Sequence, residues 1–526
     1  MTGPHPATPD PARARSERYG EVWDDYLLSR LLAGPEIDPA AVAVHTDRGS
    51  WTYGMLDREA ERIARGLWAL GVRDRDTIVV QLGNRIEFVT VCVAAFRIGA
   101  VPVLAMPSLR AVEIGRLVDA TDAGALVIGG LVDGFDHRSL ARSLGLRVPV
   151  VVAGEPEEFV ALSELDGPDR QWLPADPGDV ALVLLSGGTT DRPKLIPRTH
   201  QDYGFQLRAT AQQLGVTRDW TYLAAVPVAH NAALGCPGVL GLLRLGGEVV
   251  LSPGPAPHQA FPLIGRHRRR PILTTLMPAL LDIWTACSAY LEVDLTGTVV
   301  EVGGASMDRG RLAAAEAALG CVVTRWFGMA EGPLSFTRPG QPDRLDHEGR
   351  ALSVLDEFRI TDATHRPVRV GAWGQIEVRG PSTIRSYLGD HPANTTHFDA
   401  AGFFRTGDRG LIDAEGNLQV GGRIDDLINR GGEKIAPEDL EPQLRAAIGV
   451  DVAVAGRPDP LFGHRVVAFV AADAAGLDVD DVRRMLRERG VAEYKLPDEL
   501  VVVSSLPRTA IGKIDRAALL AGLDDR

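Results

Sequence analysis

The hydrophobic positions of the first three hundred residues alternate between helical spacing and short continuous runs. Apolar residues from Leu56 to Leu70 recur every three or four positions and stop at Gly71, which predicts a helix. A second helix is predicted over 87–97, and continuous apolar runs predict strands at 77–82, 101–105, 125–128, 148–152, 180–185 and 298–302. Strands that alternate with helices imply crossover connections, and continuous apolar runs fit strands covered on both faces. The pattern therefore predicts an α/β fold with largely parallel sheets.

The character of the chain changes after about Val420. The sequence GGRIDD at 421–426 is polar and contains glycine, as expected of a linker. Beyond it, predicted strands at 452–454, 466–471 and 500–503 and a helix over 479–489 are sufficient for a small α+β domain. We therefore predict a disordered tail over 1–18, an N-terminal domain over 19–421 and a C-terminal domain over 422–526.

Length and charge narrow the class of protein. A chain of 526 residues exceeds one ordinary core, so at least two domains are expected. Lys and Arg total 56 against 69 Asp and Glu, and the net charge of −13 argues against nucleic acid as a main partner. The four cysteines are scattered without a CxxC pair, which suggests neither a disulfide framework nor a zinc site.

Targeting signals are not evident. The N-terminus is rich in Pro and Ala and has no apolar signal-peptide core. The longest apolar stretch, 88–106, is interrupted by Arg97, Gly99 and Pro102, so it reads as a buried helix followed by a strand. We expect a cytoplasmic protein with no membrane partner.

The most informative segment, LSGGTTDRPKLIPRTH at 185–200, follows a predicted strand. Glycines let the backbone approach a phosphate, and turned N–H groups with hydroxyl side chains can surround its oxygens. The spacing is not that of a Walker A loop, because no Gly-Lys-Ser/Thr follows. The candidate phosphate-binding residues are Ser186, Gly187, Gly188, Thr189, Thr190 and Lys194.

This segment resembles the phosphate-loop signature of the adenylate-forming superfamily, which includes acyl-CoA synthetases, luciferases and the adenylation domains of nonribosomal peptide synthetases. The KLIPRTH continuation is similar to aryl-acid–AMP ligases of siderophore pathways. Asp191 departs from the usual glycine, and we expect its carboxylate to point to solvent or toward Arg192. The resemblance runs from about residue 20 to 520, and implies a large N-terminal domain, a small mobile C-terminal domain, and the use of ATP and Mg²⁺.

Two further motifs imply the rest of the nucleotide site. WFGMAEG at 326–332 resembles the segment whose glutamate, here Glu331, helps to hold Mg²⁺ at the phosphates. GFFRTGD at 402–408 resembles the segment whose aspartate, here Asp408, binds the ribose hydroxyls, and two acceptor oxygens suit a vicinal diol. The resemblance adds further nucleotide contacts at Gly304, Phe327, Gly328, Met329 and Arg423.

The C-terminal motifs imply catalysis by a moving domain. LPRTAIGKID at 506–515 resembles the motif that carries the adenylation lysine, here Lys513, whose ammonium stabilises charge that develops on carboxylate and phosphate. In the family the domain turns after adenylation, so that the loop NRGGEKI at 429–435 approaches the acyl-adenylate. The resemblance implies a hinge at Asp425, a second catalytic lysine at Lys434, and a thiol tunnel lined by Gly431 and Gly432.

The segment HNAALGCPG at 230–238 resembles the acid pocket of aryl-acid ligases. Asn231 stands where amino-acid-activating relatives place an aspartate, which favours an aryl acid whose ortho hydroxyl can bond to the amide. Cys236 and Leu334 are similar to the residues that salicylate-activating relatives carry at these positions. The chemistry agrees, because a thiol is a weak hydrogen-bonding partner for a 3-hydroxyl group on the ring. His230 and Gly303 complete the expected pocket, and Ala232 leaves space for substituted or larger ortho-hydroxy acids.

The expected function is ATP-dependent adenylation of an ortho-hydroxy aromatic acid, salicylate first, and transfer to a phosphopantetheine thiol. No carrier domain is evident in the sequence, so we expect a carrier protein that acts in trans. One alternative is an aryl-CoA ligase that uses free coenzyme A. Another is a non-catalytic nucleotide- or acyl-binding regulator, against which the filled catalytic positions argue.

Overall fold

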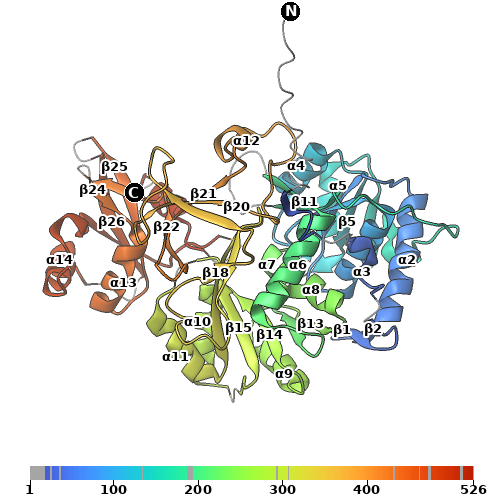
Figure 1. Cartoon of the computed structure of the whole chain (residues 1–526), viewed down its shortest axis with the longest axis horizontal. Coiled ribbons are helices and arrows are strands. Elements are labelled where there is room, and N and C mark those ends of the chain that lie inside the picture. The colour runs from blue at the N-terminus through green and yellow to red at the C-terminus, as the bar shows by residue number, and fades with distance from the viewer. Residues whose placement is uncertain are drawn as a thin grey trace, which may run out of the picture.

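The computed structural model describes residues 18–23, 27–34, 37–132, 134–185, 194–291, 294–305, 307–430, 433–460, 463–471, 476–509 and 513–524. Of the tail predicted over 1–18, only Arg18 falls in this range. Figure 1 shows an elongated molecule with the first third of the chain at one end and the last hundred residues at the other.

A seven-stranded sheet forms the first layer of strands. Its order is β11 (Leu195–Thr199), β10 (Val180–Leu185), β4 (Val101–Leu104), β3 (Thr77–Gln81), β5 (Ala125–Gly129), β8 (Val150–Ala153) and β9 (Val160–Ala161). Every neighbouring pair is parallel except β10 and β11, which form the antiparallel edge. A short hairpin of β6 (Leu131–Val132) and β7 (Phe135–Asp136) follows β5.

A nine-stranded sheet forms the second layer of strands. Its order is β18 (Arg350–Ala351), β17 (Leu334–Phe336), β16 (Val322–Gly328), β15 (Thr298–Gly303), β14 (Ile272–Leu276), β12 (Thr221–Ala224), β13 (Glu248–Leu251), β1 (Val42–Thr46) and β2 (Gly49–Thr52). The strands from β16 to β1 run parallel to one another, and the outer pairs are antiparallel.

Helices cover both faces of both sheets. The layer between the sheets contains α2 (Tyr53–Ala69), α3 (Ile86–Ile98), α6 (His200–Leu214), α7 (Asn231–Gly235) and α8 (Gly238–Leu245), which share one apolar core with inward-facing strand residues. The outer face of the first sheet packs on α4 (Ala111–Thr121) and α5 (His137–Leu144). The outer face of the second packs on α9 (Pro257–His267), α10 (Pro278–Cys287) and α11 (Arg309–Leu319).

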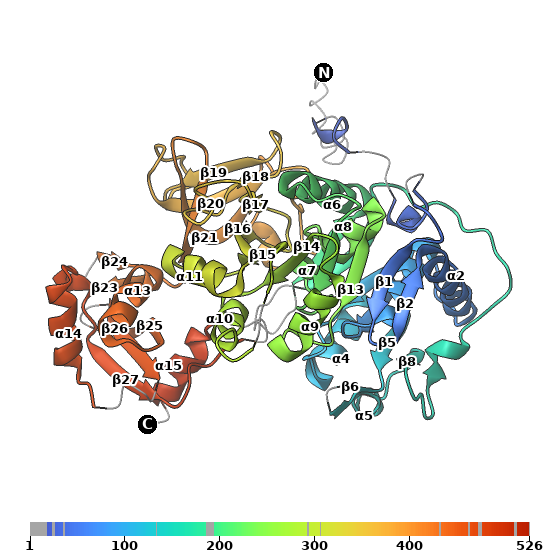
Figure 2. The ribbon, with the colours of Figure 1, turned by 90° about the horizontal axis from the view of Figure 1, so that it is seen from below.

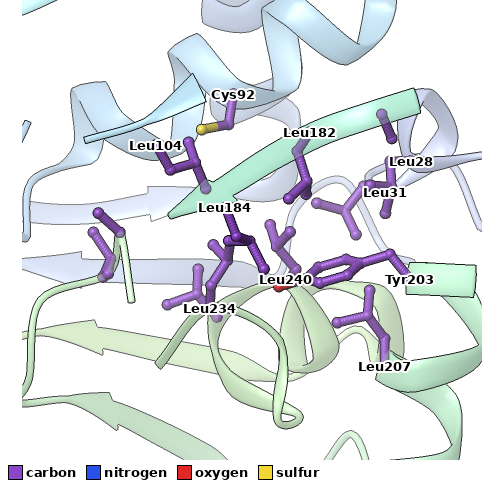
Figure 3. Packing of buried hydrophobic residues seen from close by; sticks show 14 of the residues in the cluster. Leu28, Leu31, Cys92, Leu104, Leu182, Leu184, Tyr203, Leu207, Leu234 and Leu240 are labelled. Carbon is purple, nitrogen blue, oxygen red and sulfur yellow. The ribbon is translucent and has the colours of Figure 1, made fainter. Parts of the chain in front are cut away.

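The central core joins segments that lie far apart in the sequence. Figure 3 shows the leucines of β10 between Cys92 and Leu104 on one side and the side chains of α6 to α8, among them Tyr203, on the other. Helix α3 is apolar on nearly its whole circumference, and ten of its thirteen residues are buried, because it lies between two sheets instead of on a surface. A helix that is hydrophobic all round belongs in such an interior.

A four-stranded antiparallel sheet and a separate C-terminal unit complete the chain. The sheet runs β19 (Glu357–Thr361), β20 (Gly374–Arg379), β21 (Phe404–Ile412), β22 (Leu418–Arg423), with α12 (Ala393–Thr396) before β21. The C-terminal sheet contains β23 (Ile428–Arg430), β24 (Glu433–Ile435), β25 (Val452–Asp459), β26 (Gly463–Ala471) and β27 (Glu499–Val503). Around it lie α13 (Pro437–Ile448), α14 (Val479–Glu488) and α15 (Arg516–Asp524), and Figure 2 shows this unit beside α10 and α11.

The predicted strands and helices are confirmed, with small changes at their ends. Helix α2 begins at Tyr53, earlier than predicted, because the hydroxyl of Thr52 accepts a hydrogen bond from the backbone N–H of Met55 and caps the first turn. Strand β25 is longer than the apolar run at 452–454, because its polar half pairs with β26 as far as Asp459. The domain boundary at 421/422 stays a prediction, and it falls inside β22; sheet membership favours a boundary between Arg423 and Ile428.

Candidate active site

A cleft opens where the parallel strands of the nine-stranded sheet end. Strands β14, β15 and β16 end at Leu276, Gly303 and Gly328 on the same edge. Ligands of open α/β sheets bind outside the carboxyl ends of the strands. A cavity of about 310 Å³ lies here, between this edge, strands β21 and β22, and the C-terminal unit.

Seven residues that the motifs predicted line this one cavity: Gly304, Phe327, Gly328, Met329, Asp408, Arg423 and Lys513. They come from three parts of the fold, namely the ends of β15 and β16, the β21–β22 pair, and the segment before α15. The cavity therefore joins motifs that lie as far apart in the sequence as Gly304 and Lys513.

Two glycines allow close approach at the floor of the cleft. A Cβ on Gly303 would lie 2.4 Å from the ring of Trp326, and one on Gly328 would lie 2.3 Å from Cδ2 of Leu334. Both distances are far below van der Waals contact, so the indole and the leucine can occupy these positions only if the strands carry glycine there. The predicted pocket residue Leu334 is itself 2% exposed.

Opposite charges face one another across the cleft. Asp408 and Arg423 are cross-strand partners in β21 and β22, with Oδ1 and Nη1 3.5 Å apart. Burial raises the pKa of Asp408 to about 6, and the charges of Arg423 and Lys513 oppose that rise. Desolvation by the cleft walls lowers the pKa of Lys513, and the Asp408 carboxylate again opposes the shift. The lysine of the C-terminal unit thus lies within electrostatic range of the predicted ribose-binding carboxylate.

The predicted metal-binding carboxylate is held by an aromatic side chain. Glu331 is 3% exposed, and the hydroxyl of Tyr387 donates to its Oε1 at 2.9 Å. The ammonium of Lys194 lies 5.4 Å from the centre of the Tyr387 ring. Lys194 and Glu331 therefore both lie beside one tyrosine, although they belong to different motifs.

A buried ion pair supports the loop that carries Glu331. Arg198 is fully buried, and its Nε donates to Asp202 at 2.9 Å. Its other nitrogens donate to the backbone carbonyls of Ala330 and Ser382, each at 3.1 Å. One guanidinium thereby ties β11 and α6 to the residue before Glu331.

The predicted acid pocket is a network of neutral hydrogen-bonding groups. The hydroxyl of Tyr203 donates to Oδ1 of Asn231 at 2.9 Å, and Nε2 of Gln206 donates to the Gly235 carbonyl at 2.9 Å. Nε2 of Gln206 also lies 3.6 Å from the sulfur of Cys236. Burial raises the pKa of both Tyr203 and Cys236, so the phenol and the thiol stay protonated at neutral pH.

His230 joins the acid pocket to the lysine of the C-terminal unit. Its Nδ1 accepts the backbone N–H of Ala232 at 3.2 Å and so caps helix α7. Burial, together with the charge of Lys513, lowers the pKa of His230 to about 4. The imidazole is therefore neutral at pH 7, and Lys513 lies in range of both the acid pocket and the nucleotide cleft.

Comparison with known families decides the classification. The model of the AMP-binding enzyme family matches residues 35–388, and the model of the AMP-binding enzyme C-terminal domain matches residues 447–513. The chain belongs to the AMP-binding enzyme family. It is an adenylating enzyme that uses ATP with Mg²⁺.

Curated relatives of this AMP-binding enzyme align over almost its whole length. Triostin synthetase I of Streptomyces triostinicus is 44% identical over 91% of each chain. The 2,3-dihydroxybenzoate-AMP ligase of Bacillus subtilis is 39% identical over 96% of this chain and 94% of its own. The salicyl-AMP ligase / salicyl-S-ArCP synthetase of Mycobacterium tuberculosis is 38% identical over 98% of this chain and 94% of its own.

A solved structure confirms the fold class. The apo structure of MbtA from Mycobacterium smegmatis is 38% identical and has a TM-score of 0.73, over 98% of both chains. The adenylate-forming architecture predicted from the motifs is thus the architecture of this AMP-binding enzyme.

The chemistry of the cleft fits the ions and nucleotide of the family. Glu331 offers one buried carboxylate, and a single carboxylate together with phosphate oxygens is a common set of Mg²⁺ ligands. Arg423, Lys513 and Lys194 supply positive charge for phosphates, and Asp408 supplies acceptor oxygens for a diol. The individual roles of these residues stay predictions.

Several predicted residues lie outside the cavity or outside the described residues. Asp425 is exposed in the turn between β22 and β23, and the backbone of Lys434 pairs with Asn429 in the β23–β24 hairpin. Predicted residues that fall outside the described ranges are Ser186, Gly187, Gly188, Thr189, Thr190, Gly431 and Gly432, together with Asp191 and Arg192.

The motifs did not reveal the partners that hold the predicted residues in place. Tyr203 and Gln206 bond to Asn231 and Gly235, and Tyr387 bonds to Glu331. An isolated tyrosine or glutamine carries no signal of its role in one sequence. Only Arg198 could have been suspected, since a charged residue inside the apolar KLIPRTH strand needs a buried partner.

Proposed function

We propose that this enzyme joins an aromatic carboxylic acid to AMP and passes the acyl group to the phosphopantetheine thiol of a carrier protein. The observation that carries the proposal is the neutral pocket around Asn231. An amino acid would bring an α-ammonium group, which needs a carboxylate partner in a buried site. Asn231 offers an amide, and Tyr203 donates to it from a protonated phenol.

The proposed reaction is attack of the acid on ATP, assisted by the charged residues of the cleft. The carboxylate of the acid attacks the α-phosphorus of ATP, and pyrophosphate leaves. Negative charge grows on the carboxylate and phosphate oxygens, and we propose that Lys513, which lies in electrostatic range of both His230 and Asp408, stabilises it. Asp408 and Arg423 hold the ribose side, and Lys194 and Glu331 hold the phosphates and Mg²⁺.

The ring of the acid is proposed to be of the salicylate type. Cys236 is buried among Asn231 and Gln206, and its thiol is a weak hydrogen-bonding partner. A 3-hydroxyl group placed against it would be poorly paired, which costs about 1–3 kcal/mol. The names of the relatives are compatible with both salicylate and 2,3-dihydroxybenzoate, because a 2,3-dihydroxybenzoate ligase and a salicyl ligase are almost equally similar to the chain.

A carrier protein is the proposed acceptor, and free coenzyme A is the alternative. Names of relatives support both, since one is a salicyl-S-ArCP synthetase and another is a salicylyl-CoA synthase from a Streptomyces species. Thioester formation measured in parallel with coenzyme A and with a phosphopantetheinylated aryl carrier protein separates the two. Turnover at least tenfold faster with coenzyme A would replace the carrier proposal.

The test of the proposed reaction is ATP–pyrophosphate exchange across benzoate, salicylate, 2,3-dihydroxybenzoate, 3-hydroxyanthranilate, methylsalicylates and several amino acids. We expect salicylate-type acids to lead. The Lys513→Ala variant should lose exchange by about a hundredfold or more, the scale of removing one positioned electrostatic group. Lys495→Ala is the matched control, because Lys495 lies in the C-terminal unit away from the cavity and should retain full activity.

Three results would contradict the proposal. Exchange only with amino acids would overturn the substrate class. Exchange with no acid at all would favour a non-catalytic binding protein. A kcat/KM for 2,3-dihydroxybenzoate at least tenfold above that for salicylate would overturn the interpretation of Cys236 and Leu334.

A further inference from the structure

A buried carboxyl group lies beside the acid pocket, on strand β15. Glu301 is fully buried, and the sheet register places it between Thr275 of β14 and Thr324 of β16. Its neighbours Val300 and Val302 pack into the core under α9 to α11. Because side chains alternate along a strand, Glu301 faces the opposite side, where α6 to α8 carry the acid pocket.

A relay of hydroxyl groups fixes one oxygen of this carboxyl group. The hydroxyl of Tyr222 donates to Oγ1 of Thr275 at 3.2 Å, and Oγ1 of Thr275 donates to Oε2 of Glu301 at 3.0 Å. Burial raises the pKa of Glu301 to about 8, so the carboxyl group is protonated at neutral pH. Because Oε2 already accepts a hydrogen from Thr275, we assign the proton to Oε1, which then acts as a donor.

That donor has no partner in the part of the chain that the structure describes. Oε1 of Glu301 is buried and unbonded, and so are Oγ1 of Thr324 and Nε1 of Trp326 on the same face of the neighbouring strand β16. Oε1 of Gln206, which bonds to the acid pocket through its amide nitrogen, is also unpaired. Buried polar atoms are rarely left unpaired, so such a group on one face points to polar atoms of a ligand.

Glu301 shares its surroundings with the acid pocket. Burial is the main cause of the raised pKa values of Cys236 and Tyr222, and a negative charge on Glu301 would add to both. Cys236 in turn lies 3.8 Å from Nδ2 of Asn231. Glu301 therefore lies within electrostatic range of Cys236, which itself contacts the predicted pocket residue Asn231.

We propose that Oε1 of Glu301 donates a hydrogen bond to a ring nitrogen of the acid, so that the substrate is a nitrogen heteroaromatic carboxylic acid. This inference rests on the proposed function and narrows its substrate class. A ring nitrogen accepts a hydrogen bond and adds no volume to the ring, which suits a donor in a closed core. Asn231 can still bond an ortho hydroxyl group on the same ring, and Ala232 beside it is a small, buried side chain.

The experiment compares acids in which one CH is exchanged for N. Benzoate is compared with the three pyridinecarboxylates, 2-naphthoate with quinoline-2- and quinoline-3-carboxylate, and salicylate with 3-hydroxypyridine-2-carboxylate. We measure kcat/KM in ATP–pyrophosphate exchange and, separately, binding of the acid by calorimetry. We expect at least one nitrogen isomer to exceed its carbocyclic counterpart about tenfold or more, the effect of one well-placed buried hydrogen bond.

Two variants assign that preference to Glu301. Glu301→Leu removes the donor, and the ratio between the nitrogen acid and its carbocycle should fall to about one. Glu301→Gln keeps an N–H donor, and should retain most of the preference.

The wild-type preference should decline as pH rises through about 8 and Glu301 ionises, whereas the Gln variant should show no such decline. Tyr222 and Cys236, which lie in electrostatic range of Glu301, and Tyr203 of the acid pocket all have raised pKa values and do not ionise in this window.

Thermal unfolding supplies a readout that is independent of activity. The pKa of Glu301 is higher in the folded protein than in the unfolded chain, so ionisation of the unfolded chain lowers stability as pH rises from about 4.5 to about 8. Glu301→Gln removes this group, and its Tm should therefore exceed the wild-type Tm increasingly over that range. An unchanged difference in Tm between pH 5 and pH 8.5 would count against a buried, protonated Glu301.

The outcomes separate this inference from the proposed function. Equal use of every carbocyclic and nitrogen acid, or a preference that survives in Glu301→Leu, overturns the role of Glu301. If Glu301→Leu does not fold, the pH profile of Glu301→Gln decides in its place. If nitrogen acids bind with the expected preference and no acid supports exchange, the ring inference stands and the adenylation proposal fails. If no aromatic acid binds, both fail.

Discussion

At the scale of single residues, lysine and arginine occupy different kinds of position in this protein. Lysine occurs at only four positions of the chain, Lys194, Lys434, Lys495 and Lys513, while arginine supplies all other cationic side chains. Three of these lysines lie in motifs that are predicted to surround ATP and the acyl-adenylate. A compact charge on a flexible stem suits a group that a domain must deliver, whereas arginine suits fixed ion pairs such as Arg198 with Asp202.

Cys236 is the residue whose replacement should shift the choice of acid. In Cys236→Ser a hydroxyl replaces a weakly bonding thiol beside Asn231 and Gln206. The ratio of kcat/KM for 2,3-dihydroxybenzoate to that for salicylate should rise about tenfold, since the 3-hydroxyl gains a buried partner. Cys287→Ser is the control, because Cys287 closes α10 away from this network and should leave the ratio unchanged. A ratio that stays constant in Cys236→Ser would remove Cys236 from the pocket.

At the scale of secondary structure elements, the acid pocket depends on how closely α6 and α7 approach. A Cβ on Gly235, the last residue of α7, would lie 2.3 Å from the hydroxyl oxygen of Tyr203 on α6. That tyrosine bonds to Asn231 and is fully buried, so it has little freedom to move. The glycine therefore sets the distance between the two helices and the position of Asn231.

Gly235→Ala should accordingly damage acid binding more than nucleotide binding. We expect kcat/KM for the acid to fall at least tenfold, because overpacking at such a contact typically costs about 1–3 kcal/mol, while KM for ATP changes less than threefold. Gly265→Ala is the matched control: it is exposed on α9 with no atom within 4 Å of the added Cβ. That variant should be fully active and slightly more stable, since alanine favours a helix by about 0.5–1 kcal/mol. Comparable losses in both variants would show that the contact with Tyr203 is unimportant.

At the scale of the whole molecule, the structure holds the C-terminal unit with Lys513 in the cleft. Lys513 is in electrostatic range of Asp408 and His230, and three residues later Arg516 bonds to Glu441 at 2.7 Å within its own unit. The unit and the rest of the chain meet at the cavity and are connected through the turn at Asp425. We predict that this is the orientation for adenylation. The resemblance to the family predicts a second orientation for transfer to a thiol, in which the β23–β24 hairpin approaches the cleft.

A rigid turn at Asp425 should separate the two half-reactions. Asp425→Pro restricts the backbone at the predicted hinge without touching the cavity. We expect ATP–pyrophosphate exchange to stay within threefold of the wild-type rate and thioester formation to fall at least tenfold. Asp425→Ala removes the same carboxylate but keeps a flexible backbone, and should retain both activities. Equal losses of exchange and thioester formation in Asp425→Pro would contradict a hinge at this position.

Much of the fold could be predicted from the sequence, because its signals are local. Continuous apolar runs mark the buried parallel strands, and a helix apolar on all sides marks α3 between two sheets. Turn and capping residues shift the ends of elements by a few positions, as Thr52 does at α2. The order of strands was not predicted, since β1 at the start of the chain pairs with β13, two hundred residues later. Such pairing reflects the packing of whole layers.

The sequence by itself determined the reaction class and most candidate site residues, because phosphate, ribose and thiol recognition use short contiguous motifs whose backbone and side chains act together. Only the tertiary structure decided which side chains hold those residues. Tyr203 meets Asn231 across 28 residues, Tyr387 meets Glu331 across 56, and Thr275 meets Glu301 across 26. Strand order and helix packing create these contacts, and neither can be predicted from the local pattern of apolar and polar residues. The same packing buries Glu301 beside the acid pocket, where a glutamate that is unremarkable in the sequence becomes a hydrogen-bond donor.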